Sequence, residues 1–267
     1  MIQFHVYPGG VKRIVTFSFD DGSPNDARLI RLMDQYGLRG TFHLNGINHR
    51  NNTEEQRNAT RELYSKHEIA CHTLSHGWPS RMPSGSLVTE TMQDRTILDQ
   101  IAGYPVTGMS YPSGSYNDAV KNTMAACGIE YSRTTKATND FDLPCDLLEW
   151  HPTCHFKDAA PCIERFLQGL DSQWVKPLLY IWGHSHELRS EQDWADMEHL
   201  LSSVAGRSEI WYATNGEIAD YLHAQQLLKV SVDEKHFYNP SALDVWVERD
   251  KRERICIPAG LHLTINE

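Results

Sequence analysis

The sequence has 267 residues, a length that suits one large domain, and 40% of them are hydrophobic, enough to fill a sizeable core. Acidic residues outnumber basic ones 35 to 25, which leaves a formal net charge of −10 and excludes the basic surface that a nucleic acid partner would require.

Short strand-like runs alternate with amphipathic helical stretches along most of the chain. The run RIVTFSF, residues 13–19, alternates apolar with small polar side chains and predicts a half-buried strand. Pro24 then opens a helix that Gly37 closes, and GTFHLNG, residues 40–46, predicts the next strand.

The same alternation continues as far as residue 226. After a helix that ends near Lys66, further strands are expected at HEIAC (67–71), 106–111, 129–133, 146–151, 177–182 and 209–213, with helices at 87–102, 116–127, 159–170, 191–205 and 215–226. This order indicates an α/β fold, an irregular parallel (β/α)7-8 barrel. An open doubly wound sheet is the alternative, because a strand count does not show closure.

The last forty or so residues have a different pattern, without the alternation of strands and helices. The runs KVSV, LDVWVER and RICIPAG read as short strands with no helices between them. We therefore expect a barrel domain over residues 1–226 and a small β appendage over 227–267. An appendage of this size needs to pack on the barrel to be stable.

Two features bear on the compartment. The N-terminus lacks the apolar stretch of a secretory signal, and no window reaches the ~18 apolar residues of a membrane span. We therefore expect no transmembrane segment and a cytoplasmic location, or an extracytoplasmic one if a signal has been removed. The 6 cysteines are widely spread with no CxxC pair, and we expect buried thiols in preference to a disulfide framework.

Two adjacent acids end the first strand. Asp20 and Asp21 precede Gly22, and the loops after barrel strands are where function resides. Asp before Gly is also ordinary turn chemistry. Catalysis and a plain turn are therefore both open from these residues alone.

A histidine pair supplies the second cluster. His72 and His76, in CHTLSHG, are four residues apart, a spacing that brings both imidazoles to one side of a helical turn or tight loop. Two histidines and one carboxylate would leave coordination positions open for water, as in a catalytic metal site.

The two clusters together resemble the polysaccharide deacetylase family, the metal-dependent carbohydrate esterases of family four. FSFDDG followed by HTLSH some fifty residues later matches the first two motifs of that family, and the resemblance extends over about residues 13–215. It implies that Asp21, His72 and His76 ligate one divalent metal ion and that Asp20 is the catalytic base.

The resemblance also implies a late histidine at the end of a barrel strand. His184, in IWGHSHEL, directly follows the strand at 177–182 and is the expected general acid. His186 is the competitor, and strand alternation argues against both side chains entering the cleft.

The third family motif is altered. The family has Arg, any residue, Pro, any residue, Gly, whereas this chain has SYPSG with Ser110 in the arginine position. That arginine normally orients and ionises the base, so its loss leaves the anchoring of Asp20 unexplained. The backbone N–H of Ser113 is expected to face the substrate carbonyl as an oxyanion donor.

The remaining candidates contact substrate or lie in the fourth motif. Aromatic rings near strand ends either stack on sugars or belong to the core; those considered are Tyr111, Tyr116, Trp182 and Trp211, of which Tyr111 and Tyr116 are taken as substrate residues. The fourth motif, an Asp and Trp pair, has Asp142, Asp146 and Trp150 as candidates.

The sequence therefore predicts a metal-dependent hydrolase that removes an N-acetyl group from an N-acetylated carbohydrate, its expected partner. Zn²⁺ is the expected ion, with Co²⁺ and Ni²⁺ as alternatives. An amidohydrolase acting on a small non-sugar amide or ureide is the second possibility, and a non-catalytic carbohydrate-binding protein is the third. The oligomeric state stays open.

Overall fold

A parallel, curled sheet organises the larger part of the molecule. The computed structural model describes residues 1–169, 176–251 and 253–265. Within these ranges one 8-stranded sheet has the order β6-β5-β4-β3-β2-β8-β7, and β9 also pairs with β2. Its strands are β2 (Arg13–Asp20), β3 (Gly40–Leu44), β4 (Glu68–Cys71), β5 (Gly108–Ser110), β6 (Tyr131–Arg133), β7 (Cys154–His155), β8 (Leu178–Gly183) and β9 (Ile210–Tyr212). The expected irregular (β/α) barrel fold is confirmed.

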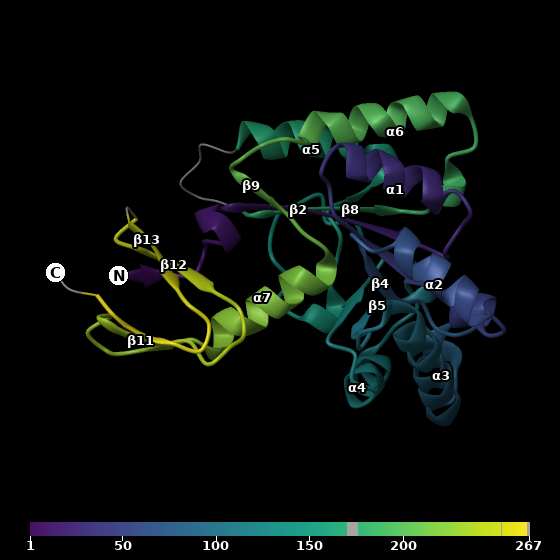
Figure 1. Cartoon of the computed structure of the whole chain (residues 1–267), viewed down its shortest axis with the longest axis horizontal. Coiled ribbons are helices and arrows are strands. Elements are labelled where there is room, and N and C mark those ends of the chain that lie inside the picture. The colour runs from purple at the N-terminus through teal and green to yellow at the C-terminus, as the bar shows by residue number, and fades with distance from the viewer. Residues whose placement is uncertain (170–175, 252, 266–267) are drawn as a thin grey trace.

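Seven α-helices follow or connect these strands in the described ranges. They are α1 (Asp26–Gln35), α2 (Glu54–Leu63), α3 (Ser84–Ala102), α4 (Asp118–Ala126), α5 (Ala159–Gln168), α6 (Glu191–Val204) and α7 (Asn215–Leu227). Figure 1 shows α1, α5 and α6 together over one side of β2 and β8, with α2, α3 and α4 farther round the curl. These ranges agree closely with the sequence prediction, except that position 170 of the expected helix 159–170 lies outside the described residues.

Strand β2 is buried on both faces, not half-buried as the alternation suggested. All 8 of its residues are buried. Phe19 belongs to the large apolar core and packs against Phe42, with ring centroids 5.7 Å apart. The side chains on the other face of β2, which point into the barrel, are polar and hydrogen-bonded. Thr16 donates to Asn215 at 2.9 Å, and the hydroxyl of Tyr180 donates to that of Ser18 at 3.1 Å. Alternation on this strand therefore separates an apolar layer from a polar barrel interior.

The segment around residue 150 connects the two edges of the sheet. The expected strand at 146–151 is wrong: Leu147–Glu149 form a 3-10 turn, and only Trp150 makes a parallel bridge, to Arg133 of β6. The chain then continues into β7, which pairs with β8. The short segment from Trp150 to β7 therefore bridges the gap in the curled sheet between β6 and β8.

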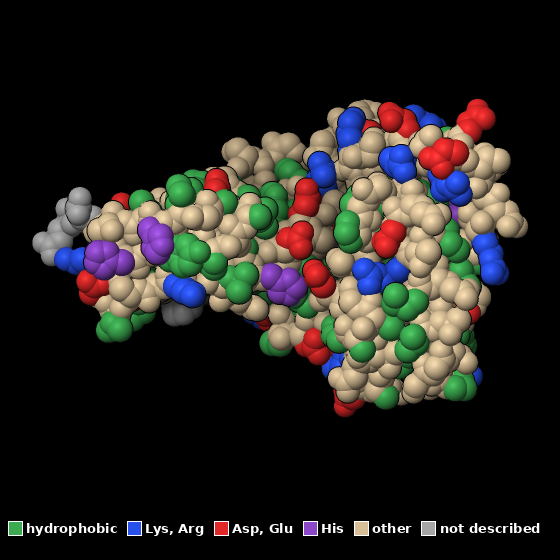
Figure 2. Space-filling model, turned by 60° about the horizontal axis from the view of Figure 1, so that its bottom comes forward, with side chains coloured by type: hydrophobic (Ala, Val, Ile, Leu, Met, Phe, Trp, Pro, Cys, Tyr) green, Lys and Arg blue, Asp and Glu red, His purple; other side chains and the backbone are tan. Residues whose placement is uncertain are grey.

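The C-terminal residues form two small antiparallel sheets that pack on α7. The orders are β1-β12-β13 and β10-β11-β14, built from β1 (Ile2–Gln3), β10 (Lys229–Val230), β11 (His236–Tyr238), β12 (Val245–Arg249), β13 (Glu253–Ile257) and β14 (His262–Thr264). Ala224 and Leu228 meet Val245, Val247 and Ile257 in a separate apolar cluster. Strand β1, at the start of the chain, pairs with β12 of this appendage. The appendage extends as a narrow lobe from the wider barrel (Figures 1 and 2).

The cysteines and the helix lengths can be described directly from the structure. Every cysteine of the chain is a free thiol in the structure, and four are buried: Cys71, Cys127, Cys154 and Cys162. Among the residues that the structure describes, none of the helices combines the length and the apolar character needed to cross a bilayer.

The apolar layer between the sheet and the outer helices should dominate the free energy of unfolding. Phe42 is fully buried and its ring lies 5.1 Å from that of Tyr64. Phe42→Ala should lower the free energy of unfolding by about 3–5 kcal/mol, because it leaves a cavity in a packed core. Met92→Ala, at a 43% exposed position on α3, should change it by less than about 0.5 kcal/mol. Urea unfolding followed by circular dichroism measures both, and similar losses would contradict this prediction.

Candidate active site

The chemistry-bearing side chains gather where the parallel strands end. Asp20 is the last residue of β2 and Asp21 follows it, His72 follows β4, and His184 follows β8. Because the carboxyl ends of parallel strands share one edge, residues distant in the sequence meet there. Each sits directly at a strand end, where the rigid ladder fixes its backbone.

Three ligand atoms converge at this edge. Asp21 Oδ1 lies 3.5 Å from His72 Nε2 and 3.5 Å from His76 Nε2. The three side chains place one ligand atom each within 4.8 Å of one another. Ligand atoms of a tetrahedral zinc site, with bonds of about 2.0–2.1 Å, lie about 3.3–3.4 Å apart. The donor set and its spacing therefore fit a divalent ion such as Zn²⁺ with positions left open.

The backbone turns sharply to bring two of these residues inward. Asp21 has φ 79° and His76 has φ 56°, both in the left-handed region that non-glycine residues rarely occupy. Such conformations cost free energy and cluster at functional sites. For Asp21, this turn redirects its carboxylate away from that of its neighbour Asp20.

His72 presents one defined ring nitrogen to the cluster. Its Nδ1 lies 2.9 Å from the carbonyl oxygen of Ser110 and 2.7 Å from the hydroxyl of Ser110. An Nδ1–H that donates to this carbonyl leaves the lone pair on Nε2, the atom that faces Asp21. Burial lowers the pKa of His72, against the opposing effect of Asp20 and Asp21.

Two further residues, which sequence reasoning did not identify, hold the backbone of this strand end. The side-chain amide of Asn45 donates to the carbonyl oxygens of His72 and Thr73, at 2.7 and 2.9 Å. Asp94 of α3 accepts from the backbone N–H of His72 at 3.1 Å. The polar end of GTFHLNG was a signal for Asn45, whereas no sequence signal marked Asp94.

Asp20 lies in a buried polar setting, 2% exposed. Ser110 donates to its Oδ1 at 3.0 Å, and the guanidinium of Arg133 donates to its Oδ2. Burial alone would raise the pKa of Asp20, but the Arg133 guanidinium, aided by His72, holds it well below its usual range. Burial also lowers the pKa of nearby His43 to about 3, so that ring is neutral and Arg133 supplies the compensating charge.

The two adjacent acids thus have different surroundings. Asp20 Oδ2 lies 3.9 Å from His72 Nε2, and Asp21 Oδ1 lies 3.5 Å from the same atom. Asp20 is bound to Arg133 within the barrel, whereas Asp21 faces both histidines of the HxxxH pair. A group held between these atoms would be in reach of both carboxylates.

Both late histidines approach the cluster, so the alternation argument against this was wrong. His184 Nε2 and His186 Nδ1 lie 3.9 and 3.8 Å from Asp21 Oδ2. Alternation does not apply because Ser185–Glu187 form a 3-10 turn. The two rings differ in support: His184 Nδ1 lies 2.8 Å from Glu187 Oε1, and the ring of His186 is more exposed.

The predicted substrate residues have mixed outcomes. Tyr111 is fully buried and its hydroxyl donates to the carbonyl of Leu148, so its predicted substrate contact is wrong. Tyr116 is half-buried, stacks on Tyr111 and donates to Glu149. Ser113 is exposed, with φ 55°, in the loop after β5, and its role as oxyanion donor stays a prediction.

The fourth-motif candidates contact residues outside the convergent cluster. Trp150 is fully buried, with its ring between those of Tyr131 and Tyr180. Asp142 pairs with Lys176, and Asp146 pairs with Lys121.

Glu187 is the carboxylate that contacts His184. Burial would raise the pKa of Glu187, but Lys157 and His184 lower it to about 2.

Of the remaining aromatic candidates, Trp182 lies at the site and Trp211 does not. The Trp182 ring lies 5.7 Å from that of His184, and the Arg133 guanidinium lies over it. Trp211 packs with Tyr7 and Tyr221 in a second apolar cluster, so the structure favours the core interpretation for Trp211.

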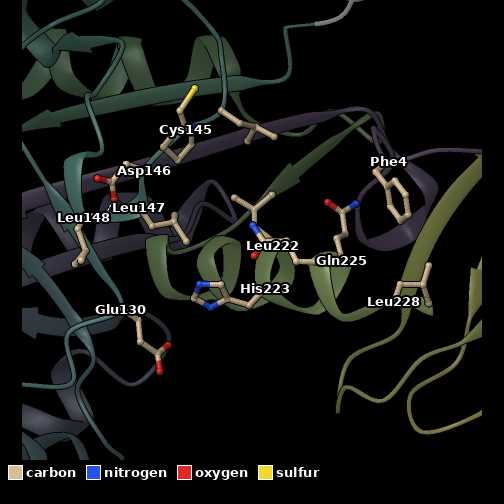
Figure 3. Close-up of a pocket in the computed structure, with 13 residues that line it drawn as sticks. Phe4, Glu130, Cys145, Asp146, Leu147, Leu148, Leu222, His223, Gln225 and Leu228 are labelled. Atoms are coloured by element: carbon tan, nitrogen blue, oxygen red, sulfur yellow. Dashed lines mark hydrogen bonds between the residues drawn. The ribbon is translucent and has the colours of Figure 1, made fainter. Parts of the chain in front are cut away.

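Another group of possible ligands lies at the opposite end of the barrel. Glu130 precedes β6, and Asp220 and His223 belong to α7; their ligand atoms lie within 4.8 Å of one another. Glu130 and His223 also line a cavity of about 750 Å³ between α7 and the 143–148 segment (Figure 3). Both acids of this group are exposed, and the group serves as a control when metal binding by the strand-end cluster is tested.

Known proteins match this chain in sequence and in fold. Residues 9–132 match the family model for polysaccharide deacetylase. A chitin deacetylase of Arthroderma benhamiae is 28% identical over 167 residues, which cover 61% of this chain and 42% of that protein. A chitin deacetylase of Pestalotiopsis is 27% identical over 133 residues, covering 49% and 45% respectively. The matches therefore span less than half the length of these curated relatives.

The fold matches a solved structure over most of its length. A putative polysaccharide deacetylase from Mycobacterium smegmatis superposes with a TM-score of 0.61 at 18% identity. The match covers 82% of this chain and 93% of that one. At this identity the likeness is one of fold.

The convergent cluster should bind metal more strongly than the acidic group at the opposite end. Protein incubated with Zn²⁺ and desalted should retain about one ion per chain, and Asp21→Asn, His72→Ala and His76→Ala should each retain much less, because each removes one of three ligands. His223→Ala is the matched control and should retain as much as wild type. Elemental analysis measures this, and equal metal content in all five proteins would contradict it.

Proposed function

We propose that the chain belongs to the polysaccharide deacetylase family, whose model matches residues 9–132, and that it is a metal-dependent hydrolase that removes the N-acetyl group from an N-acetylated sugar or saccharide. The observation that carries this proposal is the convergence of three ligand atoms beside a separate, buried and ionised carboxylate. Water adds to the amide carbonyl, the C–N bond breaks, and acetate and a free amine leave.

A bound Zn²⁺-like ion would lower the pKa of a coordinated water from about 15.7 to about 7 and would polarise the amide carbonyl. Asp21, His72 and His76 would hold it. Each of the remaining tasks falls to a side chain or backbone group of this chain.

Asp20 accepts the proton of the attacking water. It suits a general base because Arg133 and Ser110 keep its carboxylate ionised and oriented, with Oδ2 directed at the edge where the ligand atoms meet. The backbone N–H of Ser113, an exposed residue, would stabilise the oxyanion as the carbonyl becomes tetrahedral.

His184 protonates the departing amine. Its Nδ1 is engaged by the Glu187 carboxylate, which orients the ring and leaves Nε2 directed at the cluster. An amine is a poor leaving group without a proton, so amide hydrolysis depends on this acid.

A substrate screen tests the proposed function directly. Wild-type protein supplied with Zn²⁺, Co²⁺ or Ni²⁺ should release acetate and amine in equal amounts from N-acetylated sugars or their oligomers. Asp20→Asn should retain its metal and lose turnover by about 10²–10⁴-fold, as expected for a missing base.

Other outcomes of the same screen would assign a different function. Release of amine from small non-sugar amides or ureides alone would favour an amidohydrolase. Saccharide binding without release from any substrate would favour a carbohydrate-binding protein. Loss of metal from Asp20→Asn would contradict the separation of base from ligand.

The general acid has a distinctive substrate signature. His184→Ala should hydrolyse an activated aryl acetate far better than an N-acetyl amide, because only the amide requires a protonated leaving group. His186→Ala is the matched control and should affect the two substrates equally. Initial rates on both substrates measure this, and the reverse pattern would move the acid to His186.

A further inference from the structure

We propose that Arg133 positions the base Asp20 in this chain and replaces the arginine that the family motif carries at position 110. This inference rests on the proposed function and assigns a residue that the motif pattern does not identify. It makes the altered third motif a relocation of the arginine by one strand instead of a loss.

The sheet register makes this relocation possible. Strands β5 and β6 pair in parallel with Ser110 opposite Arg133, so the two positions lie at the same level of adjacent strands. Neighbouring strands are about 4.8 Å apart, a gap that an arginine side chain can span. Arg133 therefore reaches Asp20 Oδ2 across the position where the family arginine would begin.

Ser110 shares the anchoring of Asp20. It donates to Asp20 Oδ1 while Arg133 donates to Oδ2, so both carboxylate oxygens are held. Its hydroxyl also lies 2.7 Å from His72 Nδ1. A small residue at 110 leaves room for the guanidinium from the next strand, so the residues at 110 and 133 are expected to depend on each other.

The Arg133 side chain is itself held rigidly. It is fully buried, its Nη1 donates to the carbonyl of Thr134, and its guanidinium carbon lies 4.3 Å from the centroid of the Trp182 ring. A guanidinium fixed by packing and hydrogen bonds fixes its partner in turn. Asp20 Oδ2, the oxygen that Arg133 holds, lies 3.9 Å from His72 Nε2 and therefore faces the ligand cluster.

A purely structural ion pair is the alternative, and exchanging the two residues separates it from a positioning role. The variants are Arg133→Ser, Ser110→Arg, and the exchange Ser110→Arg with Arg133→Ser, which keeps the same two side chains. Arg13→Met is the matched control: Arg13 is another buried arginine, but it donates to the backbone carbonyls of Gly169 and Lys176. All are compared per folded, metal-loaded molecule.

The proposal predicts that Ser110→Arg lowers kcat in the wild-type protein and raises it in the Arg133→Ser variant. Arg133→Ser should keep its metal content and KM and lose kcat by about 10²-fold, the cost of a misplaced base. Ser110→Arg alone should lower kcat, because two guanidinium groups compete for one space. The exchange should recover at least about tenfold of the loss in Arg133→Ser, and Arg13→Met should keep the wild-type kcat.

The substrates distinguish this role from that of the acid. Loss of base positioning should slow an aryl acetate and an N-acetyl amide alike, whereas loss of His184 should slow mainly the amide. If Arg133→Ser does not fold, Arg133→Met keeps most of the buried volume beside Trp182 and should show the same loss.

Failure of the inference and failure of the proposed function give different results. Wild type active on aryl acetate but on no N-acetylated saccharide would refute the proposed substrate, and the ester would still report on Arg133. Wild-type kcat in folded Arg133→Ser would overturn the inference alone. An exchange variant that folds, binds metal and remains as slow as Arg133→Ser would also overturn it.

Discussion

Two carboxylates on consecutive residues must share the end of one strand, and the site is built around that constraint. Asp20 and Asp21 repel each other, and Asp20 is almost fully buried, where an unpaired charge would be protonated. The fold separates the two by direction. The left-handed backbone at Asp21 turns its carboxylate to the histidines, while Asp20 remains in the strand and faces Arg133.

The polar interior of the barrel makes this burial tolerable. Below Asp20 on the same strand, Ser18 and Thr16 are hydrogen-bonded to Tyr180 and Asn215. Farther round, Glu68 accepts from Tyr131 at 2.7 Å and from Thr41 and the Gly216 backbone at 2.8 Å. Because these inward side chains hydrogen-bond to one another, the buried ion pair extends a polar network instead of interrupting an apolar core.

Much of this arrangement was readable from the sequence, for reasons that differ by element. The strand and helix alternation fixed the fold class because periodicity reports burial directly. The convergence of Asp21, His72 and His76 was readable because strand-end motifs meet at one edge of a parallel sheet. The half-buried reading of β2 failed because small polar residues there face an enclosed interior, and alternation alone does not distinguish an interior from solvent.

The remaining differences concern features that depend on three-dimensional neighbours. The 3-10 turn at Ser185–Glu187 overrides strand alternation and lets both late histidines approach Asp21. Tyr111 is at a strand end, as expected, but its hydroxyl donates to Leu148 in a 3-10 turn thirty-seven residues later, and the ring is fully buried. Neither contact has a local sequence signal.

Arg133 shows how a motif can lose a residue while the site keeps the corresponding group. A motif fixes a position in the sequence, whereas a carboxylate needs only a guanidinium at the correct point in space. In a parallel sheet, residues paired across neighbouring strands lie side by side at one level, so Arg133 at the end of β6 and Ser110 at the end of β5 both reach Asp20. An arginine can move to the neighbouring strand because its long side chain spans the extra strand spacing. A metal-ligating histidine or aspartate is shorter and cannot span it. This difference in reach accounts for a chain that keeps the two motifs containing Asp21, His72 and His76 while its arginine stands on the neighbouring strand.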